Sequence, residues 1–154
     1  MLSWDGGAGT LNWTDARNWT GDVLPGADDD VILDNAGTVT LTSSTSIRSL
    51  TATGNLRLAA TTLTIAADSV NRATMLLESG HISGPGRFTN EGTLTVIGNA
   101  RVSTAFTNAA TGTISLATDL GSGQLTVSTD WSNAGVVELR GVQPAGYLYS
   151  SGYN

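Results

Sequence analysis

A short phrase recurs three times in the second half of the chain. Each copy has an aromatic residue, a small hydroxyl residue, an asparagine, small residues with a glycine, and then alternating apolar residues; the copies run over 88–96, 106–116 and 131–139. The aromatic residues stand 18 and then 25 residues apart. These intervals fit one supersecondary unit per repeat, with an insertion in a loop of the second interval. The first hypothesis is therefore a stack of coils.

Short alternating segments support this hypothesis. From Val31 onward, segments of three to five residues alternate apolar and polar and are bounded by Gly, Asn, Asp or Ser. Alternation turns one side inward and the other outward, and this length suits one side of a coil. The stretch 68–79 also fits a helix capped by Asp68 or Ser69, but we interpret it as a loop entering a strand at about 73–78, because Gly80 follows at once. At roughly 20 residues per coil, the region after Val31 predicts about six coils.

The recurring Asn and Gly residues have two structural interpretations. Turns that need a positive φ accept Gly at no steric cost and Asn at a small one. The asparagine amides can also stack as a ladder between coils, which satisfies polar groups that would otherwise be buried unpaired. We predict a structural role for both recurring positions, the buried ring column Phe88, Phe106 and Trp131 and the amide ladder Asn90, Asn108 and Asn133.

Composition excludes several classes of protein. The 154 residues suffice for one elongated domain, with 40% apolar and 13% charged residues. The net charge is −6, and the basic residues are seven scattered arginines without a lysine, which argues against nucleic acid as a partner. The chain has no cysteine, so disulfides and thiolate metal sites are excluded. No apolar run approaches the roughly 20 residues that span a bilayer, so we expect no membrane insertion.

Two regions carry a resemblance to a known class of protein. The segment 80–96 resembles the repeats of bacterial surface β-helix proteins, such as autotransporter passenger regions and filamentous-haemagglutinin-like adhesins. The opening is similar to the start of many such proteins, through the segments 4–10, 12–13, 18–19, 24–26 and 28–33. The resemblance extends from Trp4 to about Leu139. It implies a right-handed parallel β-helix, secreted or on the bacterial cell surface, and parallel crossovers are overwhelmingly right-handed.

The open ends of such a stack need caps, because they expose unpaired backbone groups. We assign the Trp-rich segment 1–30 to an N-terminal cap and 31–154 to β-helix coils. We expect the sequence to be a fragment of a longer protein.

Two residue clusters are candidate binding sites. Trp4, Trp13 and Trp19 are either a platform for sugar rings or a buried plug at the end of the stack; a sugar site would need at least one ring in water. Asp28, Asp29 and Asp30 offer the hard oxygen ligands that Ca²⁺ requires. Their spacing matches neither an EF-hand nor the glycine-rich calcium repeat, and consecutive aspartates more often solvate a turn. Calcium is thus the one cofactor that the sequence leaves open.

The sequence shows no convergent catalytic group. His81 is the sole histidine, and alternation places it outward and exposed. Glu78, Glu91 and Glu138 lie at unlike phases of the repeat, so they should not meet on one face as acid–base chemistry requires. Arg87, Arg101 and Arg140 are interpreted as isolated charges. We expect no enzyme activity.

Three functional hypotheses follow. The preferred one is a non-catalytic extracellular structural or adhesin module, a stalk or surface-fibre unit that meets a glycan or a host-surface ligand. The alternative is a carbohydrate-binding module of a secreted polysaccharide-degrading enzyme, with exposed tryptophans and calcium on the aspartates. The third is head-to-tail self-association through Tyr147, Tyr149 and Tyr153, because end contacts that do not close make filaments.

Overall fold

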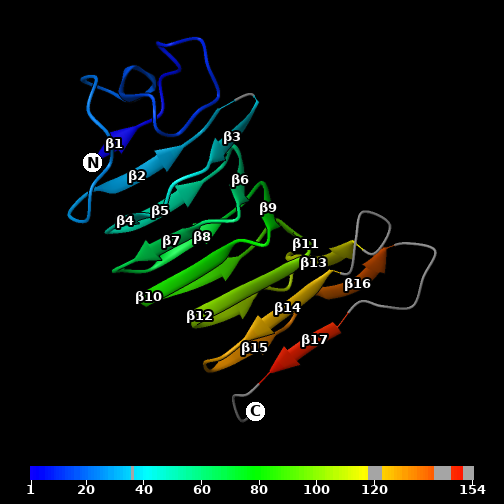
Figure 1. Ribbon diagram of the computed structural model, residues 1–154. Coiled ribbons are helices and arrows are strands. Elements are labelled where there is room, and N and C mark those ends of the chain that lie inside the picture. Colours follow the sequence, from blue (N-terminus) through cyan, green and yellow to red (C-terminus); the bar gives the residue numbers. More distant parts are fainter. Residues whose placement is uncertain (36, 118–122, 141–146, 151–154) are drawn as a thin grey trace.

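The chain folds as a parallel β-solenoid of about six turns, which confirms the predicted all-β, β-helical fold (Figure 1). The computed structural model describes residues 1–35, 37–117, 123–140 and 147–150, the last four as backbone only. Only the backbone of Tyr147 and Tyr149 is described, and Tyr153 lies outside the described residues.

Each coil contributes strands to three faces, and every ladder between coils is parallel. Face one holds β2 (Asp30–Leu33), β5 (Ser49–Ala52), β8 (Ser69–Asn71), the second halves of β10 (His81–Asn90) and β12 (Asn99–Asn108), and β15 (Trp131–Asn133). Face two holds β3 (Thr38–Leu41), β6 (Asn55–Ala59), β9 (Thr74–Glu78), β11 (Thr93–Ile97), β13 (Thr113–Ala117) and β16 (Val136–Arg140). Face three holds β4 (Thr45–Ile47), β7 (Thr62–Ile65), the first halves of β10 and β12, β14 (Gln124–Val127) and β17 (Tyr147–Ser150).

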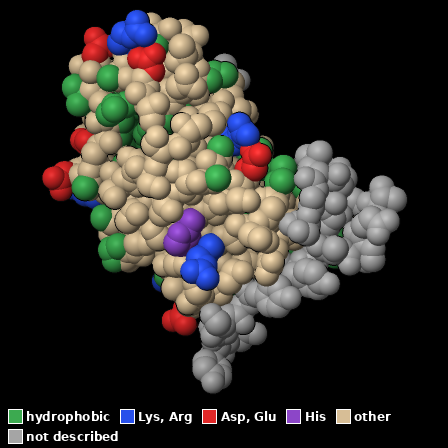
Figure 2. Space-filling model, in the orientation of Figure 1, with side chains coloured by type: hydrophobic (Ala, Val, Ile, Leu, Met, Phe, Trp, Pro, Cys, Tyr) green, Lys and Arg blue, Asp and Glu red, His purple; other side chains and the backbone are tan. Residues whose placement is uncertain are grey.

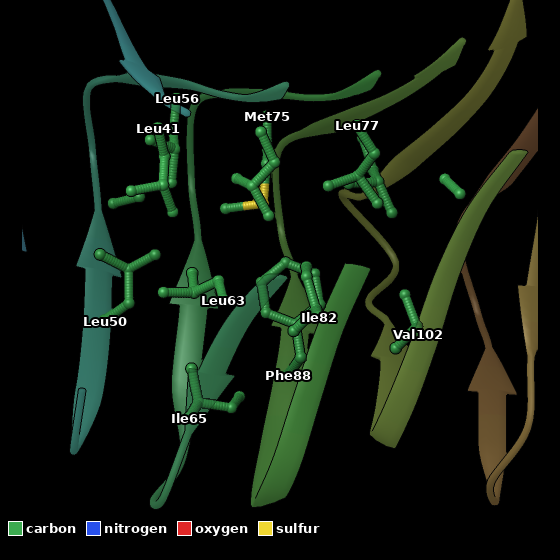
Figure 3. Packing of buried hydrophobic residues seen from close by; sticks show 14 of the residues in the cluster. Leu41, Leu50, Leu56, Leu63, Ile65, Met75, Leu77, Ile82, Phe88 and Val102 are labelled. Carbon is green, nitrogen blue, oxygen red and sulfur yellow. The ribbon is translucent and has the colours of Figure 1, made fainter. Parts of the chain in front are cut away.

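The core runs along the inside of the three faces. On face two, two inward positions of each strand repeat from coil to coil and are fully buried: Val39 and Leu41, Leu56 and Leu58, Met75 and Leu77, Leu94 and Val96, Ile114 and Leu116. Figure 3 shows Leu56, Met75 and Leu77 pointing across the interior toward Leu63 and Phe88. The predicted strand at about 73–78 is confirmed as β9, and no helix forms over 68–79.

The aromatic column is confirmed on face one. Phe88, Phe106 and Trp131 lie in register, with ring centroids 5.8 and 6.4 Å apart and ring planes inclined by 13° in both pairs. Both phenylalanines are buried and Trp131 is partly buried. The longer second interval arises between faces two and three, since β13 ends at Ala117 and β14 begins at Gln124, whereas Gly98 alone separates β11 from β12.

Positive φ does not explain the recurring Gly and Asn residues, so that prediction is wrong. None of Asn90, Asn108 and Asn133 has a positive φ, nor has Gly92 or Gly112. A Cβ on either glycine would instead collide with the previous coil, at the carbonyl oxygen of Ala73 for Gly92 and of Asn90 for Gly112. The glycine before each of these face-two strands lets successive backbones come close.

The N-terminal segment closes one end of the stack. Here β1 (Leu2–Ser3) pairs with β2, and the short 3₁₀ helix η1 (Ala16–Asn18) follows Asp15, whose side chain accepts from the Arg17 backbone N–H. The outer edge of β3 is also covered, because the Thr40 N–H donates to the Leu11 carbonyl at 2.8 Å and the Trp13 N–H donates to the Thr40 carbonyl at 3.0 Å. In the described part of the chain, no helix has the length and apolar character needed to cross a membrane.

Candidate functional site

The three cap tryptophans form one buried cluster. Trp4, Trp13 and Trp19 are 8%, 2% and 0% exposed. Their rings meet edge to face, at 5.1 Å between Trp4 and Trp19 and 4.6 Å between Trp13 and Trp19. The Trp19 Nε1–H donates to the Trp13 carbonyl at 2.8 Å. This arrangement is that of a plug, and a sugar-stacking face would require the cap to open.

The consecutive aspartates point to different partners. Asp29 accepts through Oδ2 from the Gly26 N–H at 3.0 Å. Asp30 forms a bidentate ion pair with Arg48 and accepts a hydrogen bond from the Ser49 hydroxyl at 2.6 Å. These contacts, chiefly the one with Arg48, hold the pKa of Asp30 well below its ordinary value. No group of three or more His, Asp or Glu side chains suited to a metal occurs among the residues described. Calcium binding by Asp28, Asp29 and Asp30 stays a prediction.

His81 is only partly exposed, whereas an exposed side chain was expected. It projects from face three, and its Nε2 lies 2.9 Å from the Ser103 Oγ, which in turn lies 3.0 Å from the Ser128 Oγ. Burial and the Arg101 charge lower the pKa of His81. A catalytic triad also needs a carboxylate that orients the imidazole, and no hydrogen bond or ion pair found for the described residues joins a carboxylate to His81.

The glutamates lie apart, each beside an arginine. The Arg57 Nε–H donates to Glu78 at 2.7 Å and the Arg72 Nε–H donates to Glu91 at 2.8 Å, in both cases across neighbouring coils. Glu138 accepts from Arg140 at 2.7 Å, so the interpretation of Arg140 as an isolated charge is wrong. The ion pairs between coils were not predicted from the sequence, although their separations of 19 and 21 residues match the length of a coil.

The asparagine ladder is present and has one rung more than predicted. Asn71 Nδ2 donates to Asn90 Oδ1 at 2.8 Å, Asn90 Nδ2 to Asn108 Oδ1 at 2.8 Å, and Asn108 Nδ2 to Asn133 Oδ1 at 2.7 Å. Asn71, Asn90 and Asn108 are fully buried. Their side-chain amides form hydrogen bonds between neighbouring coils, which is a structural role.

A groove lies on the outer side of face two and was not predicted. It has a volume of about 530 Å³ and crosses β9, β11, β13 and β16. Hydroxyl side chains line most of it, and the Glu138–Arg140 pair lies at one end: the lining residues are Thr74, Thr93, Thr95, Thr113, Ser115, Ala117, Glu138 and Arg140. The available sequence signal was the run of Thr and Ser at alternate positions of successive coils.

Comparison with known proteins adds no relative. No protein-family model, no curated protein and no solved structure matches the chain. The functional proposal therefore rests on the geometry of the solenoid and on the resemblance of its repeats.

Proposed function

We propose that the chain is a non-catalytic β-helical module of an extracellular bacterial protein, serving as a stalk or adhesin unit. The observation that carries the proposal is the continuity of the side-chain ladders through successive coils. Amides, aromatic rings and ion pairs each join one coil to the next. Such repetition supports a rigid, extended shape, in which each coil contacts only its neighbours.

The surface chemistry agrees with a scaffold. Figure 2 shows charged side chains scattered over the visible face, among broad areas of uncharged polar side chains and backbone. The three glutamates considered for catalysis are separately paired with arginines. General acid–base chemistry needs two groups on either side of one bond, with different pKa values, and this arrangement does not favour it.

The alternative of a carbohydrate-binding module that uses the cap tryptophans has less support. Its sugar-stacking surface requires an indole ring in water, whereas Trp13 and Trp19 are 2% and 0% exposed. The location outside the bacterial cell depends on the resemblance in the repeats and remains part of the proposal.

Two assays test this function. The purified chain should release no reducing ends or unsaturated products from a panel of plant and bacterial polysaccharides, and turnover of any of them would refute a non-catalytic module. Beads coated with the chain should bind epithelial or bacterial cells more than beads coated with serum albumin. Equal binding by both kinds of bead would remove the adhesin part of the proposal.

A further inference from the structure

The N-terminal cap contains the same three-residue phrase twice. Asn-Trp-Thr occurs at 12–14 and again at 18–20. An asparagine followed two residues later by threonine, with any residue except proline between them, is the acceptor signal for N-linked glycosylation. A motif this short also arises by chance, so the structural setting of each copy has to show which asparagine a glycosyltransferase can reach.

The copy at 18–20 is closed by the fold. Asn18 is fully buried, and its Oδ1 accepts from the Ala8 N–H at 3.1 Å. Its Nδ2 donates to the Thr10 hydroxyl at 2.9 Å and to the Asn12 carbonyl at 3.1 Å. The Thr20 hydroxyl donates to a backbone carbonyl at 3.0 Å. The polar groups that define this acceptor signal are therefore all engaged inside the cap.

The copy at 12–14 is open. Asn12 and Thr14 are both exposed, and neither side chain makes a hydrogen bond within the described residues. The chain turns here, because the Asp15 N–H donates to the Asn12 carbonyl at 3.2 Å. Only the middle residue, Trp13, is buried. The Asn12 amide can therefore be reached from solvent without any opening of the tryptophan plug.

We propose that Asn12 is an acceptor for N-linked glycosylation, and that the fold protects Asn18 in the identical phrase. The donor is a hexose joined through C1 to a diphosphate, as in a nucleotide-activated sugar. The Asn12 Nδ2 bonds to C1, and the bond from C1 to the diphosphate oxygen breaks. The diphosphate leaves with the electron pair, and one amide proton passes to a base of the transferase. This inference goes beyond the proposed stalk or adhesin function and does not depend on it.

The same geometry sets the order of folding and modification. A sugar on Nδ2 of Asn18 would break the hydrogen bonds to Thr10 and Asn12 and would need space that a close-packed interior lacks. Transfer to the unfolded chain would thus risk blocking the cap at Asn18. Transfer after folding is confined to Asn12.

The test is incubation of the folded chain with a soluble N-glycosyltransferase that recognises this signal, with UDP-glucose as donor. Trypsin cleaves after Arg17, so the two asparagines fall on different peptides, 1–17 and 18–48, for mass spectrometry. The folded chain should gain a single hexose, on the peptide 1–17. A synthetic peptide of residues 8–22, which lacks the strands that the cap packs on, should be modified at both asparagines.

Three variants of the folded chain complete the design. Thr14→Val removes an exposed hydroxyl of the signal, and transfer to Asn12 should fall to background. Asn12→Gln changes an exposed side chain without hydrogen bonds, so the fold is kept and transfer should also be lost. The matched control is Thr20→Val, which removes the hydroxyl of the other copy and should leave the modification of Asn12 unchanged.

Mass spectrometry of the protein from the cells that produce it completes the test. A single hexose on Asn12 would indicate a nucleotide-activated donor, and a longer glycan a lipid-linked donor; both support the proposal. Four results would overturn it: an unmodified Asn12 in that protein, no transfer to the synthetic peptide, transfer to the peptide but not to the folded chain, or equal transfer to Asn12 and Asn18 in the folded chain.

Discussion

Asn90 shows how much one residue can contribute to a stack of coils. Its Nδ2 donates to the Gly92 carbonyl at 3.1 Å, to Asn108 Oδ1 at 2.8 Å and to the Thr113 carbonyl at 3.1 Å. Asn90→Ala would remove these bonds and leave the Asn108 Oδ1 without its donor. Each buried group left unpaired costs about 1–3 kcal/mol, so we expect the free energy of unfolding to fall by about 3 kcal/mol. Urea titration followed by circular dichroism measures this change.

The matched control is Asn99→Ala, because Asn99 is exposed and its side chain makes no hydrogen bond within the described residues. A surface change of this kind stays within about 0.5 kcal/mol of the wild type. Equal urea midpoints for the Asn90 and Asn99 variants would contradict the structural role of the ladder.

His81 makes stability depend weakly on pH. Burial first, and the Arg101 charge second, lower its pKa in the folded state below the ordinary 6.5. The unfolded chain therefore takes up a proton before the folded chain does, and stability falls as pH drops from about 6.5 to the lowered folded pKa. We expect the imidazole to titrate below pH 6.5 by NMR.

His81→Gln should abolish the fall in melting temperature between about pH 6.5 and the lowered pKa of the imidazole. The steeper fall in melting temperature at more acidic pH, which the carboxylates cause, should remain. A folded-state midpoint above 6.5 would show that a partner stabilises the imidazolium, contrary to the structure.

At the scale of the element, the strands of face two depend on the glycine that precedes them. Gly112 comes just before β13, and a Cβ there would meet the Asn90 carbonyl oxygen and the Asn108 amide. Gly112→Ala must therefore push two coils apart, and overpacking of this kind costs about 1–3 kcal/mol. Gly26→Ala is the control, since the nearest atom to a Cβ at Gly26 lies at an ordinary contact distance of 3.8 Å. If thermal melts showed the same loss of melting temperature for both variants, this explanation would be refuted.

The same elements show how far the sequence could be interpreted. Phe88, Phe106 and Trp131 could be aligned from their repeated phrase, because every copy carries the same order of ring, amide and strand. Asn71 was missed because Ser69 holds the ring position in its coil. The groove depends on which side chains of successive coils lie on one face, and that property is not local in sequence. The recurring glycines were predicted to be structural, but for the wrong reason. Turn preferences describe the backbone near one residue, and they do not report contacts between the backbones of different coils.

At the scale of the whole molecule, the two ends differ. The N-terminal end is covered by the tryptophan plug and by the bonds of the cap to β3. In the last coil, Val137 and Leu139 take the positions of the fully buried Ile114 and Leu116, yet they are 37% and 62% exposed. Among the described residues β16 pairs with β13 alone, and an edge strand with apolar neighbours is a template for pairing. Head-to-tail filaments would require the N-terminal end to be open as well.

We therefore expect any self-association to join the C-terminal ends of two copies and to stop at a dimer, as an isologous contact does. Val137→Thr/Leu139→Thr should shift the sedimentation of concentrated protein toward the monomer. The control Val23→Thr/Leu24→Thr removes an apolar pair of the cap that is 56% and 44% exposed, and it should leave the dimer unchanged. Filaments in electron micrographs, or a loss of association in the cap variant alone, would show that the N-terminal end takes part, and the closed cap would then have to open during assembly.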